Sequence, residues 1–332
     1  MTINEGLMTI AAAAELIRNG GFLAVAGDEQ ALRQLPGGNW IGGTIPYFMA
    51  EDGGRTTREL VFVNPVEVGE PPPLIRFYSA SALPQLCRNA PEHGYSLIIV
   101  PGFSEVHASF AQNAPNYEEM YLKPLIGWVA GVHLDDLDKC TPKVVNGQTG
   151  QFSDELAIVI DVPLAAGKFA HIDIVNLFAL GAGDSISFPE AGFSAGACLI
   201  NGVPANLAKY LGEQAIDTRL PLVADYSGAL INVSIKAVVD NPSGEPHVDF
   251  YAPVFPGLAY KLAAPPGDYV SALQDALPHD ATRLTFSCNC LLNYLYCDLK
   301  GKRTAGVTGP MTFGEIAYQL LNQTLVYLRI EG

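Results

Sequence analysis

Apolar positions along the chain follow two spacings, and each predicts one kind of secondary structure. Apolar residues that recur every three to four positions, bounded by capping or turn residues, are typical of helices. Together with Ser, Asp and Pro at their starts, these patterns predict helices over 10–18, 28–35, 81–89, 104–112, 117–123, 204–211, 267–277 and 315–321.

Shorter runs that alternate or stay apolar predict strands, at 22–26, 40–48, 58–64, 96–100, 143–145, 148–152, 156–162, 170–180, 197–200, 222–224, 230–239, 248–251, 284–287 and 323–330. Asn146-Gly147 predicts a tight hairpin turn, because this pair readily adopts positive φ angles. Helices and strands alternate irregularly. This favours an α+β fold with mixed or antiparallel sheets flanked by helices over a doubly wound parallel sheet.

The composition agrees with a globular protein. Hydrophobic residues make up 49% of the 332 positions and charged residues 16%, enough apolar side chain for a large core. No uncharged apolar run reaches the roughly 18 residues of a membrane span, and the first residues lack the basic segment of a signal peptide. Six cysteines do not form a disulfide framework in so long a chain. We expect a cytoplasmic protein with reduced thiols.

The net charge of the chain indicates which classes of binding partner to expect. Lys and Arg number 19 and Asp and Glu 34, a net charge of −15. Proteins that bind nucleic acids or anionic membranes present basic surfaces. We therefore expect neither partner, and the charge favours a small molecule or another protein.

A serine motif occurs at Gly192-Phe-Ser-Ala-Gly196, which matches the G-x-S-x-G pattern of a nucleophile elbow. An elbow needs a helix directly after the serine, whereas the residues that follow Gly196 predict a strand and an Asn201-Gly202 turn. We expect a corner between strands here and no nucleophile at Ser194.

Ser104 and His107 follow the apolar strand at 96–100, where loop residues often contact ligands. Side chains three apart on a helix share a face, so the two can contact each other. Two interpretations stay open: a ligand-binding or hydrolytic pair, or a helix cap by Ser104 with His107 half-exposed.

Cys288 and Cys290 would face the same side of an extended strand, with Cys297 further on. Grouped thiolates bind soft metals or carry out thiol chemistry. The spacing is not C-x-x-C, so apolar packing or a redox-sensitive thiol is the alternative. The six histidines are scattered singly and mark no metal motif, although a single histidine can be an axial haem ligand.

Three motifs near the C-terminus resemble the end of FIST domains, which are ligand-sensing modules of intracellular signal transduction. They are Thr285-Phe-Ser-Cys288, Phe313-Gly-Glu-Ile316 and Asn322-Gln-Thr-Leu325. Weaker similarities lie at 41–44, 101–104, 125–131, 201–205, 210–212 and 256–262. Family members often carry an arginine shortly after Phe-Ser-Cys, where this chain has Asn289 and Cys290.

The resemblance implies a FIST N-like region over 1–190 and a FIST C-like region over 191–332, in two closely packed halves. It also implies a small-molecule sensor that acts through a separate signalling protein, with an amino-acid-like ligand or, as in some nitric-oxide-sensing members, haem. Ligand-binding residues are expected at strand ends and in the C-terminal motifs: Gly43, Thr44, Gly102, Ser104, His107, Cys288, Asn289, Cys290, Gly314 and Glu315.

Glu315 has two interpretations: a fixed acceptor for a ligand amine or hydroxyl, or the cap of a helix. Two alternatives to a sensor also stay open. One is a hydrolase or thiol-dependent enzyme that uses Ser104 and His107, or Cys288 and Cys290. The other is a protein that binds haem or a metal through these cysteines or a histidine.

Overall fold

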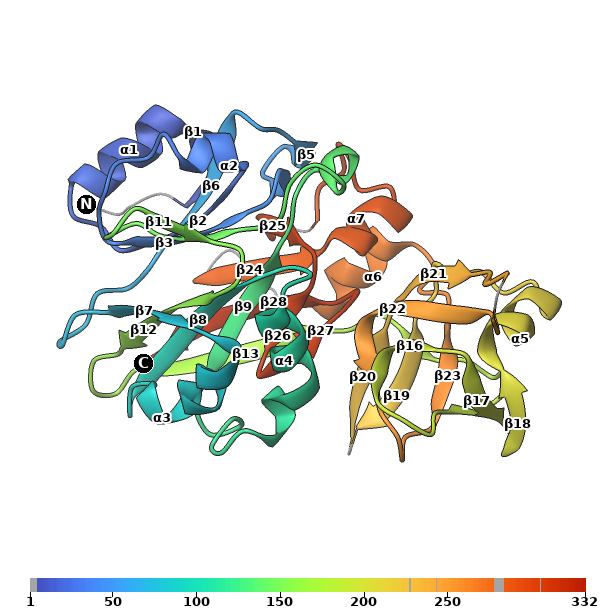
Figure 1. The fold of residues 1–332 in the computed structure, drawn as a ribbon. Coiled ribbons are helices and arrows are strands. Elements are labelled where there is room, and N and C mark those ends of the chain that lie inside the picture. Colours follow the sequence, from blue (N-terminus) through green and yellow to red (C-terminus); the bar gives the residue numbers. More distant parts are fainter. Residues whose placement is uncertain (1–4, 227, 243, 278–283, 305) are drawn as a thin grey trace. The chain divides into compact units, whose positions relative to one another are not determined.

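The computed structural model describes residues 5–226, 228–242, 244–277, 284–304 and 306–332, and its architecture is α+β, as expected (Figure 1). The chain forms two compact units. Unit 1 contains residues 1–175, 273–320 and 325–332, and unit 2 contains 176–272 and 321–324. The chain thus leaves unit 1 after Val175 and returns to it at Leu273. The expected FIST N-like region over 1–190 and FIST C-like region over 191–332 stay predictions.

The first sheet of unit 1 has the strand order β1-β6-β2-β3-β10-β11. Helices α1 and α2 lie on one of its faces (Figure 1), where Ile17 and Leu32 pack against Val25, Val61 and Val63. Thr9 caps α1 and Asp28 caps α2, each through its side-chain oxygen. The bounds are β1 Gly6–Thr9, α1 Ile10–Arg18, β2 Leu23–Gly27, α2 Glu29–Leu32, β3 Trp40–Thr44, β6 Leu60–Pro65, β10 Val144–Asn146 and β11 Gln151–Ser153.

The central sheet has the order β27-β26-β9-β8-β12-β7. Strands β8 and β9 are parallel, and β12 is antiparallel to β8. All three are almost continuously buried, which explains their uninterrupted apolar sequences. The bounds are β7 Leu74–Tyr78, β8 Gly94–Pro101, β9 Leu125–Ala130, β12 Ala157–Pro163, β26 Glu315–Ala317 and β27 Gln319–Leu321, with η1 Ala80–Gln85, α3 Leu86–Asn89, α4 Glu105–Asn113, η2 Ala114–Asn116 and η3 Leu134–Asp136 in the connections.

The third sheet of unit 1 has the order β13-β28-β24-β25-β4-β5. It joins distant parts of the chain, because β24 pairs with β28 on one side and β25 on the other, and β25 pairs with β4. The bounds are β4 Tyr47–Ala50, β5 Gly53–Thr56, β13 Phe169–Val175, β24 Phe286–Cys290, α7 Leu291–Tyr296, β25 Gly309–Thr312 and β28 Leu325–Glu331.

Unit 2 is built mainly from two antiparallel sheets around its own core. The larger has the order β18-β17-β15-β23-β19-β20, with β14 also paired to β23, and the smaller is β16-β22-β21. Leu211 of α5 and Phe188 belong to the core with Phe250 and Tyr260. The bounds are β14 Ala179–Leu180, β15 Ile186–Ser187, β16 Gly192–Ala195, β17 Ala197–Ile200, β18 Val203–Asn206, α5 Leu207–Glu213, β19 Leu222–Tyr226, β20 Ala229–Val233, β21 Ile235–Val239, β22 His247–Val254 and β23 Tyr260–Ala264; α6 follows at Tyr269–Ala276.

Several predicted elements are confirmed and others are wrong. The hairpin over β10 and β11 forms, although its positive φ lies at Gly150 and not at Asn146-Gly147. The helix expected over 117–123 is a series of turns, and the one expected over 315–321 is the strand pair β26 and β27. In the expected helix 204–211, Pro204 belongs to β18 and the helix begins only at Leu207, after the cap Asn206. At 204–206 and 315–321, pairing with a neighbouring strand outweighed the local helical pattern.

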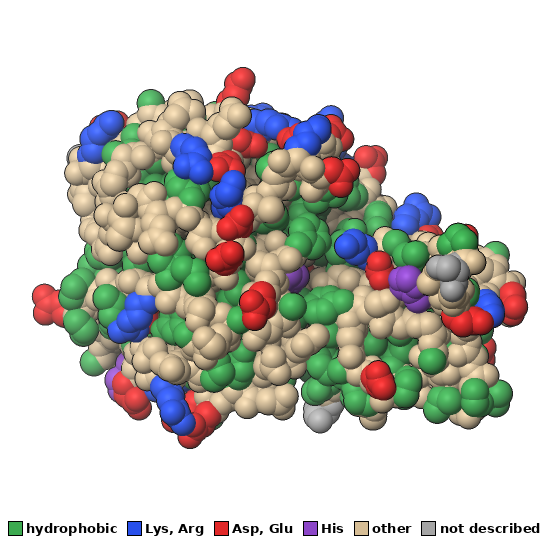
Figure 2. Space-filling model, viewed as in Figure 1, with side chains coloured by type: hydrophobic (Ala, Val, Ile, Leu, Met, Phe, Trp, Pro, Cys, Tyr) green, Lys and Arg blue, Asp and Glu red, His purple; other side chains and the backbone are tan. Residues whose placement is uncertain are grey.

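On the face drawn in Figure 2, Lys and Arg side chains are interspersed with Asp and Glu side chains. Among the described residues, no helix is long and apolar enough to span a membrane.

Candidate functional site: a carboxylate-lined cavity

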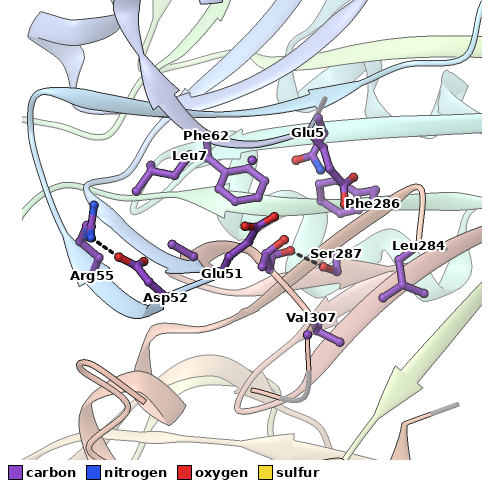
Figure 3. Close-up of a pocket in the computed structure, with 15 residues that line it drawn as sticks. Glu5, Leu7, Glu51, Asp52, Arg55, Phe62, Leu284, Phe286, Ser287 and Val307 are labelled. Carbon is purple, nitrogen blue, oxygen red and sulfur yellow. Dashed lines mark hydrogen bonds and ion pairs between the residues drawn. The ribbon is translucent and has the colours of Figure 1, made fainter. Parts of the chain in front are cut away.

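A cavity of about 570 Å³ lies within unit 1 (Figure 3). Its lining comes from β1 and β6 of the first sheet, the hairpin β4–β5, the start of β24 and the segment before β25. A volume of this size is typical of small-molecule sites. The lining residues are Glu5, Gly6, Leu7, Ala50, Glu51, Asp52, Arg55, Phe62, Asn64, Leu284, Phe286, Ser287, Gly306, Val307 and Thr308.

The alternation of strand β6 gives the cavity one of its walls. Val61 and Val63 face the core beneath α1 and α2. Phe62 and Asn64 therefore face the opposite side, where both line the cavity. Asn64 is only 4% exposed, and its side-chain amide has no hydrogen-bond partner among the described residues. Because the amide faces the open space of the cavity, it is available to a ligand or to water.

Carboxylates form the acidic part of the lining. Glu51 and Asp52 are the two turn residues of the hairpin in which Ala50 pairs with Gly53. Asp52 is neutralised by an ion pair with Arg55 (Figure 3). Glu5 turns its carboxyl group into the cavity although the residue as a whole is exposed. Burial of this carboxyl group, and then the negative charge of Glu51, raise the pKa of Glu5.

The remaining lining is apolar or already satisfied. The Ser287 hydroxyl donates a 2.7 Å hydrogen bond to the carbonyl oxygen of Thr308, so its proton is engaged. Leu7, Phe62 and Phe286 supply apolar surface (Figure 3). Phe286 also stacks on Trp128 of β9, with ring centroids 5.7 Å apart. The cavity thus combines carboxylates, one unpartnered amide and aromatic rings, a combination suited to binding an organic molecule.

The ligand-binding residues predicted from the sequence lie elsewhere, around β9 and Gly131. Chain segments far apart in sequence meet there through short polar contacts: Gly102 N to Ala130 O at 3.1 Å, Gly131 N to Thr44 O at 2.7 Å, Val129 N to Gly314 O at 2.8 Å and Cys288 Sγ to Gly127 O at 3.4 Å. A Cβ atom at Gly43 would lie 2.6 Å from Ile99 and 3.1 Å from Trp128 Nε1, so this glycine permits close packing. None of the predicted residues lines the cavity.

Glu315 belongs to this region, which we call the β9 cluster: Trp128, Cys288, Thr312 and Glu315. Glu315 is fully buried and lies opposite Trp128 in the pairing of β26 with β9. The Thr312 hydroxyl is 3.3 Å from its Oε1 atom. Because Glu315 starts a strand, its interpretation as a helix cap is wrong. Its role as a ligand acceptor stays a prediction.

The cysteines of β24 are buried, as the packing alternative expected. Burial raises the pKa of the Cys288 thiol well above its usual value, and the charge of Glu315 raises it further. Cys288 is therefore a protonated thiol that donates to a carbonyl oxygen, which disfavours thiolate chemistry. Asn289 accepts a hydrogen bond from Asn293 of α7. Among the described residues, no three His, Cys, Asp or Glu side chains group as metal ligands.

Ser104 is the cap of α4, as one of the two interpretations proposed. Its hydroxyl donates to Pro101 O at 2.6 Å and accepts from His107 N at 3.1 Å. The Nδ1 atom of His107 accepts from Phe103 N, so it is not free to activate Ser104. His107 is 8% exposed and not half-exposed as expected, and burial lowers its pKa to about 4.

The segment Gly192–Gly196 lies in β16 and the corner before β17, which confirms the absence of an elbow helix.

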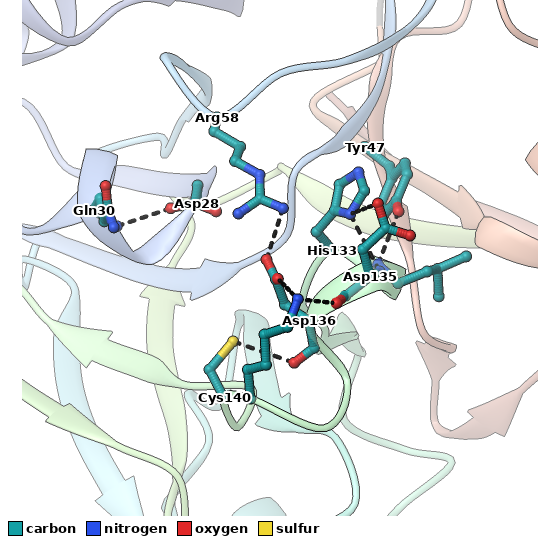
Figure 4. A network of polar contacts seen from close by, with 10 residues as sticks. Asp28, Gln30, Tyr47, Arg58, His133, Asp135, Asp136 and Cys140 are labelled. Atoms are coloured by element: carbon teal, nitrogen blue, oxygen red, sulfur yellow. Dashed lines mark hydrogen bonds and ion pairs between the residues drawn. The ribbon is translucent and has the colours of Figure 1, made fainter.

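A second polar cluster in unit 1, around Arg58, is self-satisfied (Figure 4). Arg58 and Lys139 both bind Asp136, and these interactions lower the pKa of that carboxyl. Tyr47 stacks on His133 and accepts a hydrogen bond from the amide of Leu134. These contacts fix η3 against β4, and Arg58, Lys139 and Asp136 satisfy one another's charges.

Sequence reasoning missed the cavity residues, although part of the signal was present. The strand over 58–64 was expected, and its alternation already placed Phe62 and Asn64 on one face. The approach of β24, more than 220 residues later in the chain, has no sequence signature. In the sequence, Glu5 and Glu51 are unremarkable charged residues. The tertiary structure shows that both line the cavity.

Comparison with known proteins assigns a family but no activity. A family model matches residues 8–331, nearly the whole chain, and the chain belongs to this family, DUF6976, a family of unknown function. No curated protein and no solved structure matches the chain. Nothing in these comparisons connects it to FIST domains, so that resemblance stays a prediction.

Proposed function

We propose that this member of the DUF6976 family binds a small molecule in the carboxylate-lined cavity. The observation that carries the proposal is Asn64, a buried amide that lines a space of about 570 Å³ and has no partner among the described residues. Protein interiors are close-packed, and a polar group of this kind is normally satisfied. A ligand that fills the space and bonds to Asn64 accounts for both features.

The proposal favours binding over catalysis. The described lining contains no His, Cys or Lys, and the Ser287 hydroxyl proton is engaged by Thr308. Nucleophilic catalysis needs a nucleophile in contact with a base. The alternative centres, Ser104 with His107 and Cys288 with Cys290, are less supported. Ser104 serves as a helix cap, the Nδ1 atom of His107 is engaged by Phe103 N, and burial raises the pKa of the Cys288 thiol well above its usual value. Binding of a metal ion has no supporting group of three His, Cys, Asp or Glu side chains among the described residues.

The role we propose is that of a sensor read by a separate protein. Phe286 both lines the cavity and stacks on Trp128, which is fully buried in β9. A ligand that contacts Phe286 can thus shift the packing of the central sheet and favour one conformation over another. The C-terminal motifs that resemble FIST domains support the same role.

The proposal is tested by blocking the cavity. Wild type is incubated with a bacterial small-molecule extract, freed of unbound compounds by gel filtration and analysed by native mass spectrometry. We expect one retained compound in the wild type and none in Leu7→Trp or Thr308→Phe, two variants that add bulk from different segments of the lining. Leu74→Trp, at an exposed position outside the cavity, is the matched control and should retain the compound.

A bound compound also raises thermal stability by mass action, by about 2.7 kcal/mol at a concentration of 100 times Kd. The increase should occur in the wild type and in Leu74→Trp alone. Equal retention by all variants would place the compound elsewhere, and no retention by the wild type would count against the binding function.

A further inference from the structure

We propose that the molecule bound in the cavity is an organic cation: a protonated amine on an apolar body. This inference rests on the proposed binding function and adds the chemical class of the ligand. Its starting point is the balance of charge in the lining. Arg55 is the one cation among the described lining residues, and it is paired with Asp52. Glu5 and Glu51 have no cationic partner among the described residues.

The two remaining carboxylates repel each other. Glu5 and Glu51 both line the cavity, and burial, followed by the negative charge of Glu51, raises the pKa of Glu5. A protonated amine placed between them would offset this repulsion and form charge-assisted hydrogen bonds with both. An anionic ligand would add a third negative charge to the same space, and this disfavours carboxylic acids and phosphates.

The aromatic part of the lining points to the same class. Phe62 and Phe286 both face the cavity, and the face of an aromatic ring attracts a cation (Figure 3). Leu7, Leu284 and Val307 add an apolar surface that would cover the body of the molecule. Asn64 offers a carbonyl oxygen that can accept a further hydrogen bond from the ammonium group.

A bare metal ion fits the cavity poorly. Divalent cations of the calcium and magnesium type require about six oxygen ligands at short distance. The described residues contain no group of three carboxylate, His or Cys side chains that would hold an ion, and much of the lining is hydrocarbon. The volume of about 570 Å³ also exceeds the needs of an ion and suits an organic molecule.

Isothermal titration calorimetry with two series of matched compounds tests the charge of the ligand. The first series is 2-phenylethylamine, 2-phenylethanol and phenylacetate, and the second is 1,5-diaminopentane, 1,5-pentanediol and glutarate. Within each series the shape is nearly constant and the charge changes. We expect an amine to bind at least tenfold more tightly than its alcohol and its acid. The affinity should fall at higher salt and as the pH falls toward the raised pKa of Glu5.

The variant Glu51→Gln keeps the shape and removes one charge. We expect it to weaken amine binding at least tenfold and to leave the melting temperature nearly unchanged, because Glu51 is an exposed turn residue. The matched control is Glu59→Gln, which removes a charge from an exposed residue outside the lining and should bind amines like the wild type.

The outcomes separate the two proposals. If neither amine binds, or if an alcohol or acid binds as tightly as its amine, the cation inference is overturned. In that case the compound retained from the extract, and lost in Leu7→Trp, still supports the binding function. If Glu51→Gln and Glu59→Gln lose affinity equally, the amine responds to the net charge of the protein and not to the cavity, which also overturns the inference.

Discussion

The cavity and the β9 cluster are neighbours, joined by the stack of Phe286 on Trp128, but they hold their carboxylates in opposite ways. Glu51 lines an open space and has no cation beside it among the described residues. Glu315 is fully buried in a strand and lies beside the Thr312 hydroxyl. Both regions also contain aromatic rings and hydroxyl groups. The residue types that suggest a ligand site are therefore the same, and only the free space distinguishes a site from a core.

Asp161, in β12 of the central sheet, is a core carboxylate like Glu315 and not a cavity carboxylate like Glu51. It is buried, accepts a 2.6 Å hydrogen bond from Ser96 and pairs with Arg76 at 2.8 Å. Changes within the sheet should consequently alter stability, and changes in the cavity lining should alter binding. The following variants test this division.

The largest effect is expected from Trp128→Ala. Trp128 is a fully buried side chain, and truncating such a residue leaves a void and costs about 3–5 kcal/mol. Urea unfolding followed by circular dichroism measures the loss. Leu122→Ala, at a residue that is 78% exposed, should change stability by less than about 0.5 kcal/mol. A loss below about 1 kcal/mol for Trp128→Ala would mean that the β9 cluster is not tightly packed.

The second effect concerns pH and Asp161. Burial raises the pKa of Asp161 to about 6, although the Ser96 hydroxyl and the Arg76 charge act against this shift. The folded state thus binds a proton at a higher pH than the unfolded state does, so this group favours folding more as the pH falls from 7 toward 4. The gain is on the order of 2–3 kcal/mol.

The experiment compares the wild type with Asp161→Asn at several pH values. The difference in unfolding free energy should move in favour of the wild type as the pH falls through 6, because only the wild type takes up the proton. A constant difference would indicate that Asp161 has an ordinary pKa and is not a strained buried carboxylate.

The smallest effect is the sharpest comparison, between two threonines four residues apart. The Thr312 hydroxyl is buried and lies within hydrogen-bond distance of Asn289 O, Gly314 O and Glu315. Thr312→Val keeps the shape and should cost about 1–2 kcal/mol, because buried acceptors lose their donor. Thr308 lines the cavity, and only its carbonyl oxygen is used, so Thr308→Val should be nearly neutral for stability. Equal losses in denaturant unfolding would remove the distinction between the two regions.

The local structure of the chain was readable from its sequence where short-range chemistry decides. Asp28 and Ser104 cap helices because a side-chain oxygen next to a helix start meets free backbone amides, whatever the rest of the fold does. The apolar runs at 96–100 and 156–162 became buried strands. The irregular order of elements was sufficient for the α+β class.

The sequence reasoning failed where a distant strand supplied the partner. Residues 315–321 have a helical appearance, yet β26 forms because it pairs with β9, where Glu315, Ile316 and Ala317 lie opposite Trp128, Gly127 and Ile126. The same limit applies to the site. The sequence singled out Cys288 and Glu315 for their chemistry, and packing against β9 buried both.

The amino-acid sequence by itself determined the α+β class, most strands, the helix caps and the acidic charge of this protein. Only the tertiary structure decided which carboxylates face a cavity, which side of β6 is open and which predicted site residues are core. The physical reason is that capping and strand alternation depend on neighbours along the chain. A cavity depends instead on how β1, β6, β24 and the β4–β5 hairpin, drawn from both ends of the chain, fail to fill the space between them.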